Sequence, residues 1–308
     1  YQLPLDINNG STLAIGLRKL KSTYNGYAIR LRRSTDNAEM SFGFVGNDLD
    51  VAAIATWLGG ASGYCTTLFD QSGAGNNVTQ VNNSNQPLFV ANGISGKPIL
   101  RFNTNQFMNN SVNYTAPYTV IYGAKQTGPA RKRVLSSKVN NWLLGWWEGA
   151  KGQAYFEGWL NLLPGSPTAD NNYYIYSGAS NGTVSQSYEN GALLFSNGNG
   201  VAGPNGIQLN AYQNGTSEAS DCDFTDVIIY SSVLSNADRS AVESEIRGYY
   251  STTTSQVSVS PSSSTIYTVT GYDLNGCSST ASVSVTVNTN PVLSCPSNIS
   301  QILNTGVC

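Results

Sequence analysis

The chain has 308 residues, of which 11% are Asp, Glu, Lys or Arg, and it contains no histidine. In an ordinary globular protein about a quarter of all residues are charged. The absence of imidazole excludes Ser-His-Asp and Cys-His catalytic pairs and histidine zinc sites, so acid–base chemistry must come from carboxylates. A formal net charge of −2 argues against nucleic acid or an anionic membrane as a partner. No apolar run approaches the roughly 20 residues of a membrane-spanning helix, so no direct membrane insertion is expected.

Up to about residue 250, short apolar segments alternate with clusters of Gly, Asn, Ser and Pro. This pattern is typical of many short strands separated by turns. The strands it predicts are residues 27–33, 64–69, 99–102, 118–122, 173–176, 207–212 and 225–230. Helical spacing of apolar residues instead occurs at 11–22, at 49–58 and after Ser235, which is the expected N-cap of the last helix. The predicted fold class is all-β, a large β-sandwich with a few peripheral helices.

The C-terminal part of the chain is almost uncharged. Every Lys and Arg lies at or before Arg247, and beyond residue 250 the one charged side chain is Asp273. We therefore place a domain edge near 250, so that residues 1–250 form the sandwich. Residues 251–291 alternate like antiparallel strands and amount to about half of an immunoglobulin-like domain. Residues 292–308 begin a further unit, so we expect the chain to be a piece of a longer protein.

Five cysteines fit an oxidising compartment more easily than a reducing one. Cys295 and Cys308 could close a small terminal loop, and Cys65 could meet Cys222 if their strands are neighbours. Cys277 would then be single. We expect a secreted, extracellular protein that is associated with a cell surface.

Several segments resemble known families. LRKLKSTYNGYAIRLRRSTDNAE, LDVAAIATWL and CTTLFDQSGAGNNVTQ resemble the N-terminal part of the fungal-type α-L-arabinofuranosidase B catalytic domain, most specifically in Asp70-Gln71-Ser72-Gly73. NGISGKPILRFN and DFTDVIIYSSVLSNADRSAVESEIRGYY resemble the concanavalin A-like lectin/glucanase, or laminin G-like, superfamily. Both resemblances imply a jelly-roll sandwich over about residues 10–250. The tail resembles surface-protein repeats of Bacteroidetes: STIYTVTGYDLNGCSSTASVSVTV is similar to their immunoglobulin-like repeats, and CPSNI to the opening of a hyalin-type repeat.

The resemblance to the arabinofuranosidases implies a retaining mechanism, which needs two carboxylates roughly 5–5.5 Å apart. Aligned with the family, KVNNWLLGWW has Asn140 where the nucleophilic Glu is expected, and AYQNGTSEASDCDF has Asn214 or Gly215 where the acid/base Asp is expected. An amide can neither attack an anomeric carbon nor protonate a leaving group. We therefore predict no catalytic residues and no enzyme activity. If the protein is an enzyme, Glu148 and Glu157 are the candidates. After a shift of register Glu218 or Asp221 could also serve.

Four of the five tryptophans lie in one short window of the sequence. Sugar rings stack on exposed aromatic faces, and neighbouring amides can hold the hydroxyls. On a strand, Trp142 and Trp146 face one way and Trp147 the other, so at least one tryptophan lies outside the core. The predicted carbohydrate-binding residues are Trp142, Trp146, Trp147, Tyr155, Trp159 and Asn140. The alternative for each tryptophan is that it fills the core.

Other polar motifs are less specific. Asp221, Asp223 and Asp226 could supply oxygen ligands to calcium, but they lack a calcium-loop signature. Asp70 is expected to accept backbone N–H groups and hold a turn. The cluster Arg131-Lys132-Arg133 is too small for nucleic acid and is expected to be a solvated strand edge.

The leading functional prediction is a non-catalytic, lectin-like adhesion module of a large secreted bacterial cell-surface protein. Its partners would be glycans or cell-surface polysaccharide, together with neighbouring copies or repeats of the same protein. One alternative is an arabinofuranosidase-like glycoside hydrolase. A second alternative is a structural subunit of an extracellular fibre or stalk.

Overall fold

The computed structural model describes residues 2–161, 168–251, 261–272 and 278–288. The chain forms two compact units, Tyr1–Thr254 and Ser255–Cys308. No helix in the described ranges has the length and apolarity needed to span a membrane.

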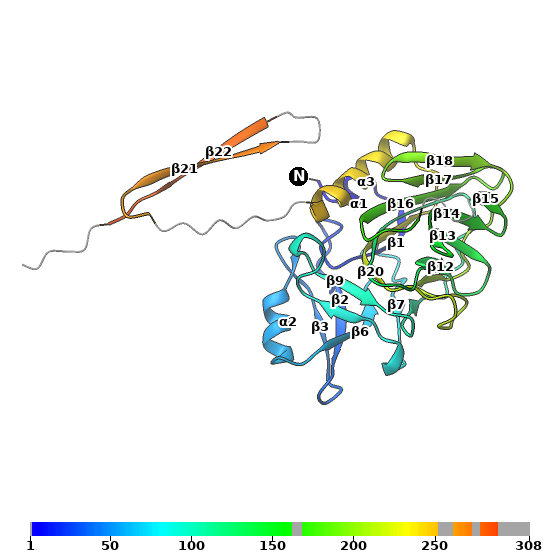
Figure 1. The fold of residues 1–308 in the computed structure, drawn as a ribbon, viewed down its shortest axis with the longest axis horizontal. Coiled ribbons are helices and arrows are strands. Elements are labelled where there is room, and N and C mark those ends of the chain that lie inside the picture. Colours follow the sequence, from blue (N-terminus) through cyan, green and yellow to red (C-terminus); the bar gives the residue numbers. More distant parts are fainter. Residues whose placement is uncertain (1, 162–167, 252–260, 273–277, 289–308) are drawn as a thin grey trace, which may run out of the picture. The chain divides into compact units, whose positions relative to one another are not determined.

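Two layers of antiparallel strands build the first unit (Figure 1). The strands of the first sheet, in spatial order, are β8 (Leu88–Val90), β9 (Ile99–Phe102), β20 (Cys222–Tyr230), β11 (Tyr118–Gln126), β16 (Tyr173–Ser180), β17 (Ser185–Glu189) and β18 (Ala192–Asn197). Those of the second sheet are β7 (Val78–Thr79), β10 (Met108–Asn109), β19 (Ile207–Leu209), β12 (Leu135–Ser137), β13 (Trp142–Trp147), β14 (Ala150–Phe156) and β15 (Trp159–Asn161). The prediction of an all-β sandwich with few helices is confirmed.

The remaining strands extend and join these sheets. β6 (Gly63–Leu68) pairs with both β7 and β8, and so connects the two layers. The other elements of the first unit are β1 (Ser11–Ile15), β2 (Ile29–Arg33), β3 (Glu39–Phe42), β4 (Phe44–Val45), β5 (Asp48–Leu49), α1 (Pro4–Ile7), α2 (Val51–Leu58), α3 (Asn236–Ser251) and the 3₁₀ turns Asn83–Asn85 and Ile94–Gly96. β2 pairs with β3 and β6, and β1 pairs with β20.

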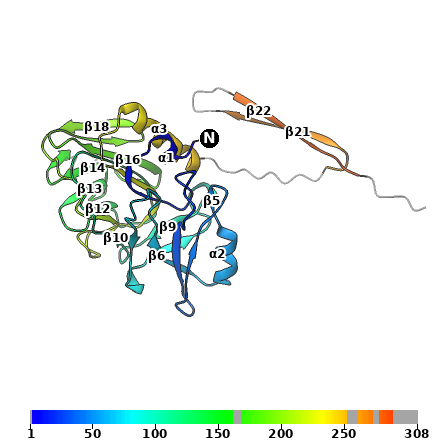
Figure 2. The same ribbon diagram turned by 180° about the vertical axis from the view of Figure 1, so that it is seen from behind.

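The core between the sheets is rich in aromatic rings. Trp142 stacks on Phe156 with ring centroids 4.9 Å apart, and Tyr122 lies 5.9 Å from Phe224 of the first sheet. A second apolar layer lies on the other side of the first sheet, where α3 buries Val242, Ile246 and Tyr250. α1 packs beside α3, as the view from behind also shows (Figure 2). The middle strands of the first sheet are therefore covered on both faces.

Two of the three predicted helices are confirmed. α2 begins at Asp50, whose Oδ1 accepts a hydrogen bond from the Ala53 N–H at 2.9 Å. In α3, Ser235 Oγ accepts from the Asp238 N–H at 3.1 Å. The helix predicted at 11–22 is wrong, because residues 11–15 form β1. Leu13 and Ile15 face the core between the sheets while Ala14 faces the layer under α3. A strand buried on both faces is apolar at every position and loses the alternation that identifies strands.

The Asp70-Gln71 motif is structural. Asp70 accepts backbone N–H bonds from Ala14 at 2.8 Å and from Asn76 at 2.9 Å, as predicted for a turn-holding carboxylate. Gln71 accepts from the Leu20 N–H at 2.8 Å and donates to the Arg18 carbonyl at 2.9 Å. The motif that carries the resemblance thus fixes the segment after β1.

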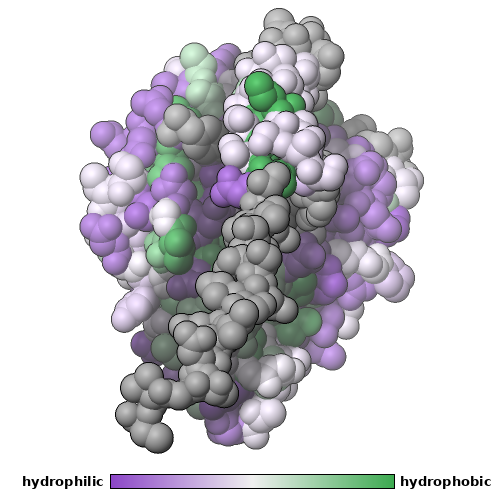
Figure 3. Space-filling model, turned by 90° about the vertical axis from the view of Figure 1, so that its left-hand side faces the viewer, coloured by the Kyte–Doolittle hydropathy of each residue, from purple (hydrophilic) through white to green (hydrophobic). Residues whose placement is uncertain are grey.

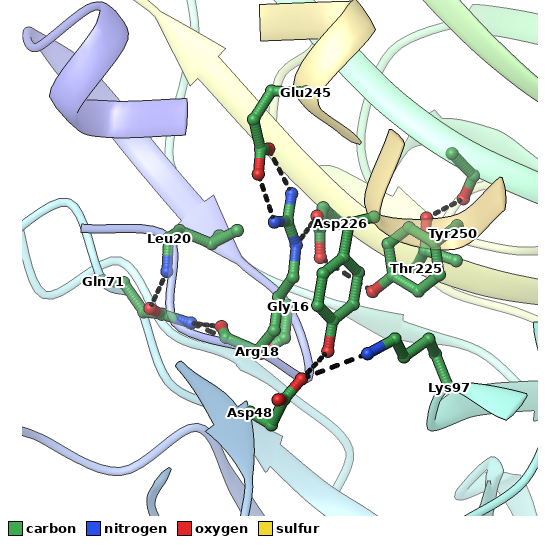
Figure 4. Close-up of polar contacts among 12 residues, drawn as sticks. Gly16, Arg18, Leu20, Asp48, Gln71, Lys97, Thr225, Asp226, Glu245 and Tyr250 are labelled. Carbon is green, nitrogen blue, oxygen red and sulfur yellow. Dashed lines mark hydrogen bonds and ion pairs between the residues drawn. The ribbon is translucent and has the colours of Figure 1, made fainter. Parts of the chain in front are cut away.

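Arg18 occupies the centre of a buried polar cluster (Figure 4). Its Nε is 2.7 Å from Asp226, and its two terminal nitrogens are each 2.6 Å from an oxygen of Glu245. Although burial opposes it, the two carboxylates raise the pKa of Arg18 above its ordinary value. For Asp226 the effect of burial has the opposite sign: burial raises its pKa, and the positive charge of Arg18 opposes that rise. The cluster ties the segment after β1 to β20 and α3.

On the face drawn in Figure 3, hydrophilic side chains predominate and hydrophobic ones form small scattered groups. In the second unit, β21 (Thr265–Tyr272) and β22 (Ser278–Val285) form an antiparallel hairpin in which Thr265 lies opposite Val285. The assignment of 251–291 to a partial immunoglobulin-like repeat stays a prediction. The predicted hyalin-type start at 292–308 lies outside the described residues.

Candidate functional site

The structure divides the predicted sugar-binding tryptophans between core and surface. Trp142 and Trp146 are both 0% exposed. Trp142 Nε1 donates to the Tyr118 hydroxyl at 3.1 Å, and the Trp146 ring packs edge-on against Tyr176. The prediction that these two rings bind a glycan is therefore wrong, because both point into the space between the sheets.

Three other predicted residues come together on the outer face of the second sheet. Trp147, Tyr155 and Trp159 are partly exposed. The rings of Tyr155 and Trp159 lie 5.0 Å apart, and those of Trp147 and Trp159 lie 6.4 Å apart. We call these three residues the aromatic patch. Partly exposed rings of this kind offer apolar faces to the C–H groups of a sugar.

Arg133 extends this patch, although the sequence predicted a solvated position for it. Its side chain is 3% exposed, and its guanidinium carbon lies 4.9 Å from the Trp147 ring centroid and 4.0 Å from that of Tyr212. Arg133 Nε is also 2.5 Å from Glu218 Oε2. Neither Arg133 nor Tyr212 was predicted as a site residue. No periodicity marks Arg133, because it precedes β12, and the loop that contains Tyr212 packs onto it from a distant part of the chain.

Two carboxylates lie near Tyr212. Glu157 is at the tip of the β14–β15 turn, where its Oε1 accepts a hydrogen bond from the Asn141 N–H at 2.7 Å. Glu218 lies on the loop between β19 and β20 and is paired with Arg133. Burial raises the pKa of Tyr212 and Arg133 opposes the rise, whereas Glu218 and Glu157 both add to it. Both carboxylates are therefore within electrostatic reach of one hydroxyl.

The loop that contains Glu218 has an unusual backbone. Five of its non-glycine residues have left-handed φ angles: Asn210 (63°), Ala211 (61°), Gln213 (44°), Asn214 (56°) and Glu218 (54°). The Asn210 side chain fixes the loop by donating to the carbonyls of Asn103 and Gln106, both at 2.9 Å. Strained residues held in place by their surroundings are concentrated at functional sites. This backbone therefore supports a functional role for the loop.

The amides at the aligned catalytic positions brace loops. Asn140 Oδ1 accepts from Ser137 Oγ at 2.5 Å and from the Asn205 N–H at 2.8 Å, while its Nδ2 donates to the Gly203 carbonyl. Asn214 Oδ1 accepts from Asn109 Nδ2 at 2.9 Å. Asn140 is partly exposed, and its role in binding carbohydrate stays a prediction.

Glu148 lies at the opposite end of β14 from Glu157. It is exposed, pairs with Lys132 at 3.1 Å and, together with Glu218, lines a cavity of about 470 Å³. The strand between Glu148 and Glu157 rises about 3.3 Å per residue, which separates the two carboxylates by roughly 20 Å or more. A retaining pair lies only roughly 5–5.5 Å apart, so Glu148 and Glu157 cannot act on the same bond.

The three candidate calcium ligands have separate partners. Asp221 accepts from the Ala130 N–H at 3.0 Å, Asp223 pairs with Arg101 at 2.8 Å, and Asp226 pairs with Arg18. Among the described residues, no group of His, Cys, Asp and Glu is arranged to hold a metal ion. The structure thus gives no support to the calcium site.

The predicted disulfide between Cys65 and Cys222 is not formed. Both are buried free thiols, and burial raises the pKa of each. Cys65 is on β6 and Cys222 on β20, and these strands do not pair with each other. Cys295 and Cys308 lie outside the described residues.

The fold is similar to those of solved arabinofuranosidases. A GH54 α-L-arabinofuranosidase soaked with a cyclic sulfate inhibitor matches with a TM-score of 0.64 and 15% identity, over 80% of this chain and 65% of that one. An arabinofuranosidase complexed with arabinofuranosyl-α-1,2-xylobiose matches with a TM-score of 0.63 and 14% identity, over 80% and 64%. The chain thus spans slightly less than two thirds of these proteins, and at this identity the likeness concerns the fold. No protein-family model matches the sequence, and a search of curated proteins finds no relative.

These similarities overturn the prediction of a non-catalytic, lectin-like adhesion module, and with it the prediction that the protein is not an enzyme. The first unit has a glycoside-hydrolase-like β-sandwich fold, which favours the hydrolase alternative. The prediction failed because it depended on Asn140 and Asn214 standing for the catalytic pair. In the structure the side chains of both make hydrogen bonds that hold loops, and Glu218 is bound instead by Arg133, which packs on Trp147 of the aromatic patch.

Proposed function

We propose that the first unit is a retaining glycoside hydrolase that acts on α-L-arabinofuranosyl groups of a polysaccharide. The observation that carries the proposal is the position of two glutamates beside the aromatic patch: Glu157 lies in the turn between Tyr155 and Trp159, and Glu218 is bound by Arg133, which packs on Trp147. The sandwich fold shared with the GH54 enzymes supports it. The aromatic patch would contact the C–H face of the sugar, and the carboxylates would act on the glycosidic bond.

The contacts of the two glutamates suggest their roles. Glu157 Oε1 is held by a backbone N–H, and its Oε2 has no hydrogen-bond partner among the described residues. We assign Glu157 as the nucleophile that attacks the anomeric carbon. Glu218 is oriented by Arg133 through Oε2. We assign Glu218 as the group that protonates the leaving oxygen and then takes a proton from the attacking water.

Release of 4-nitrophenol from 4-nitrophenyl α-L-arabinofuranoside by the full chain tests this proposal. Glu157→Gln should lower kcat by about a thousandfold or more, because an amide is not a nucleophile. In a Glu157→Ala variant, azide should restore part of the turnover, because it can enter the space of the removed carboxylate and bond to the anomeric carbon as 4-nitrophenol leaves. Glu218→Gln should lower kcat by roughly a hundredfold or more.

Glu39→Gln is the matched control, because it removes an exposed glutamate on β3 that does not line the cavity of Glu218, and it should leave kcat unchanged. Turnover that survives Glu157→Gln would exclude this residue as the nucleophile. A folded wild-type protein that hydrolyses no aryl furanoside would contradict the proposed function itself.

We further propose that the protein acts outside the cell, on polysaccharide at a cell surface. The scarcity of charge and the resemblance of the tail to surface-protein repeats support this location. Antibody labelling of intact cells tests it, and recovery of the protein from the cytosol alone would contradict it.

A further inference from the structure

Two adjoining cavities lie along another part of the first unit. One, of about 570 Å³, is lined by Arg101, Lys125, Gln126 and Asp221. The other, of about 470 Å³, is lined by Lys125, Asn190 and Arg247. Both also include Asn171, so they meet at Lys125 and Asn171. We call the pair the basic groove. Each cavity falls in the range of roughly 300–1,000 Å³ that is typical of small-ligand sites.

Positive charge exceeds negative charge in the basic groove, although the whole chain is slightly acidic. Of the described residues that line it, Asp221 is the one carboxylate, and its Oδ2 already accepts a backbone N–H. Arg101 is neutralised by a two-bond ion pair with Asp223 at 2.8 and 2.9 Å. Lys125 and Arg247 are then the two cations of the groove without an ion pair among the described residues, against the one carboxylate of Asp221.

Neither Lys125 nor Arg247 has an ion pair within the described part of the chain. Lys125 lies opposite Asp223 in the β11–β20 register, but Asp223 is held by Arg101 on its other side. Arg247 Nε is buried and has no hydrogen-bond partner among these residues. Two unpaired cations facing one groove favour a ligand with negative charge.

The other groove residues fit a saccharide. Amide side chains each carry a donor and an acceptor, as sugar hydroxyls do, and Asn171 and Asn190 line the groove. Tyr64 contributes an aromatic ring to the same lining.

The position of the groove also favours a saccharide ligand. Asn103 and Gly128 line it, and the next residue after each, Thr104 and Pro129, lines the cavity that contains Glu218. The groove therefore ends beside the cavity that Glu218 lines. The choice of a saccharide over another anion rests on the proposed function, whereas the charge argument does not.

We propose that the basic groove binds an acidic oligosaccharide, with carboxylates of uronic acid units on Lys125 and Arg247. Neutral units between them would lie against the amides and Tyr64. Such a site would hold a charged polysaccharide while a neutral furanosyl branch reaches Glu157 and Glu218.

Calorimetric titration of the full-length Glu157→Gln protein with a galacturonic acid hexamer tests the groove without hydrolysis. The hexamer should bind at least about tenfold more tightly than a galactose hexamer of the same length. Lys125→Gln and Arg247→Gln should each weaken binding by about tenfold, while Lys125→Arg and Arg247→Lys should largely retain it. Lys138→Gln removes the same charge outside both the groove and the Glu218 cavity and should leave the affinity within about twofold.

Several results would overturn the proposal. Equal affinity for the acidic and neutral hexamers would show that charge is not recognised. A hexaglutamate peptide that binds as tightly as the sugar would show that no saccharide is recognised, and inorganic sulfate that competes at the same concentration would reduce the groove to a small-anion site. Unchanged binding by Lys125→Gln, in protein that melts like the parent, would place the ligand elsewhere. Because binding is measured in the Glu157→Gln protein, these outcomes do not depend on whether the protein hydrolyses furanosides.

Discussion

The two sheets of the first unit differ in how many of their faces are covered. Every residue of β20 and every residue of β11 except Lys125 is buried, because the sandwich core lies on one side and α3 on the other. β14 in the second sheet instead exposes part of Tyr155 and Lys151. The aromatic patch lies on a face that none of the described helices covers, and Lys125, the exception on the covered sheet, lines both cavities of the basic groove. The two proposed binding regions thus both include a place where a strand reaches solvent.

The largest effect on stability should come from emptying the space between the sheets. Trp142→Ala removes a 0% exposed indole that stacks on Phe156 and donates to Tyr118. We expect the free energy of unfolding to fall by about 3–5 kcal/mol, through lost burial and the cavity left behind. Denaturant titration followed by tryptophan fluorescence measures the change. A loss below about 1 kcal/mol would show that the core can collapse around the vacancy and that the sheets are not held by this ring.

The opposite face of the same sheet should respond in binding rather than in stability. Trp159→Ala removes a partly exposed ring of the aromatic patch. The free energy of unfolding should fall by about 1 kcal/mol or less. KM for an arabinofuranoside should rise by roughly tenfold, since a stacked sugar gains about 1 kcal/mol or somewhat more from an aromatic face. If KM stays the same, the sugar does not contact the aromatic patch.

The smallest effect is expected outside both layers, at the exposed Arg33–Asp36 ion pair in the turn between β2 and β3. The hydrogen bond from Arg33, helped by the Ala38 N–H, lowers the pKa of Asp36 from 3.8 to about 2. A lowered folded-state pKa gives stability that is present above pH 3.8 and is lost as the pH falls toward about 2.

The Tm of Asp36→Asn should therefore lie slightly below that of the wild type near neutral pH and meet it near pH 2. Glu39→Gln, a neighbouring change at an exposed glutamate, should follow the wild-type curve throughout. A constant offset between Asp36→Asn and wild type at all pH values would mean that the ion pair does not hold the carboxylate in its charged form.

Sequence reasoning succeeded where a local pattern determines the structure. Turn clusters and short apolar segments predicted seven of the strands of the first unit, and helical spacing predicted α2 and α3, the latter with Ser235 as its cap. It failed at β1, since a strand covered on both faces shows no alternation. The alternation of side chains along a strand placed Trp147 on the opposite face from Trp142 and Trp146, but the sequence did not show which of the two faces is exposed to solvent.

The candidate site was harder to predict, because its parts come from segments far apart in the chain. Glu157 was named only as an alternative, and Glu218 only as a substitute after a register shift. Arg133 is buried by Trp147 and by Tyr212, which no local pattern connects to it. The alignment placed Asn140 at the position of the nucleophile. In the structure its side chain accepts hydrogen bonds from Ser137 and Asn205.

The Arg18 cluster has a consequence for how the first unit is made in the cell. Arg18 is paired with Asp226 and Glu245, residues that leave the ribosome more than two hundred positions later. β1 likewise cannot pair until its partner strand, β20, has been synthesised. Contacts between such distant positions form late and slow the folding of a domain. During synthesis the N-terminal strand and its arginine must therefore stay unpaired until α3 emerges, and a chaperone that shields β1 would protect nascent chains from aggregation.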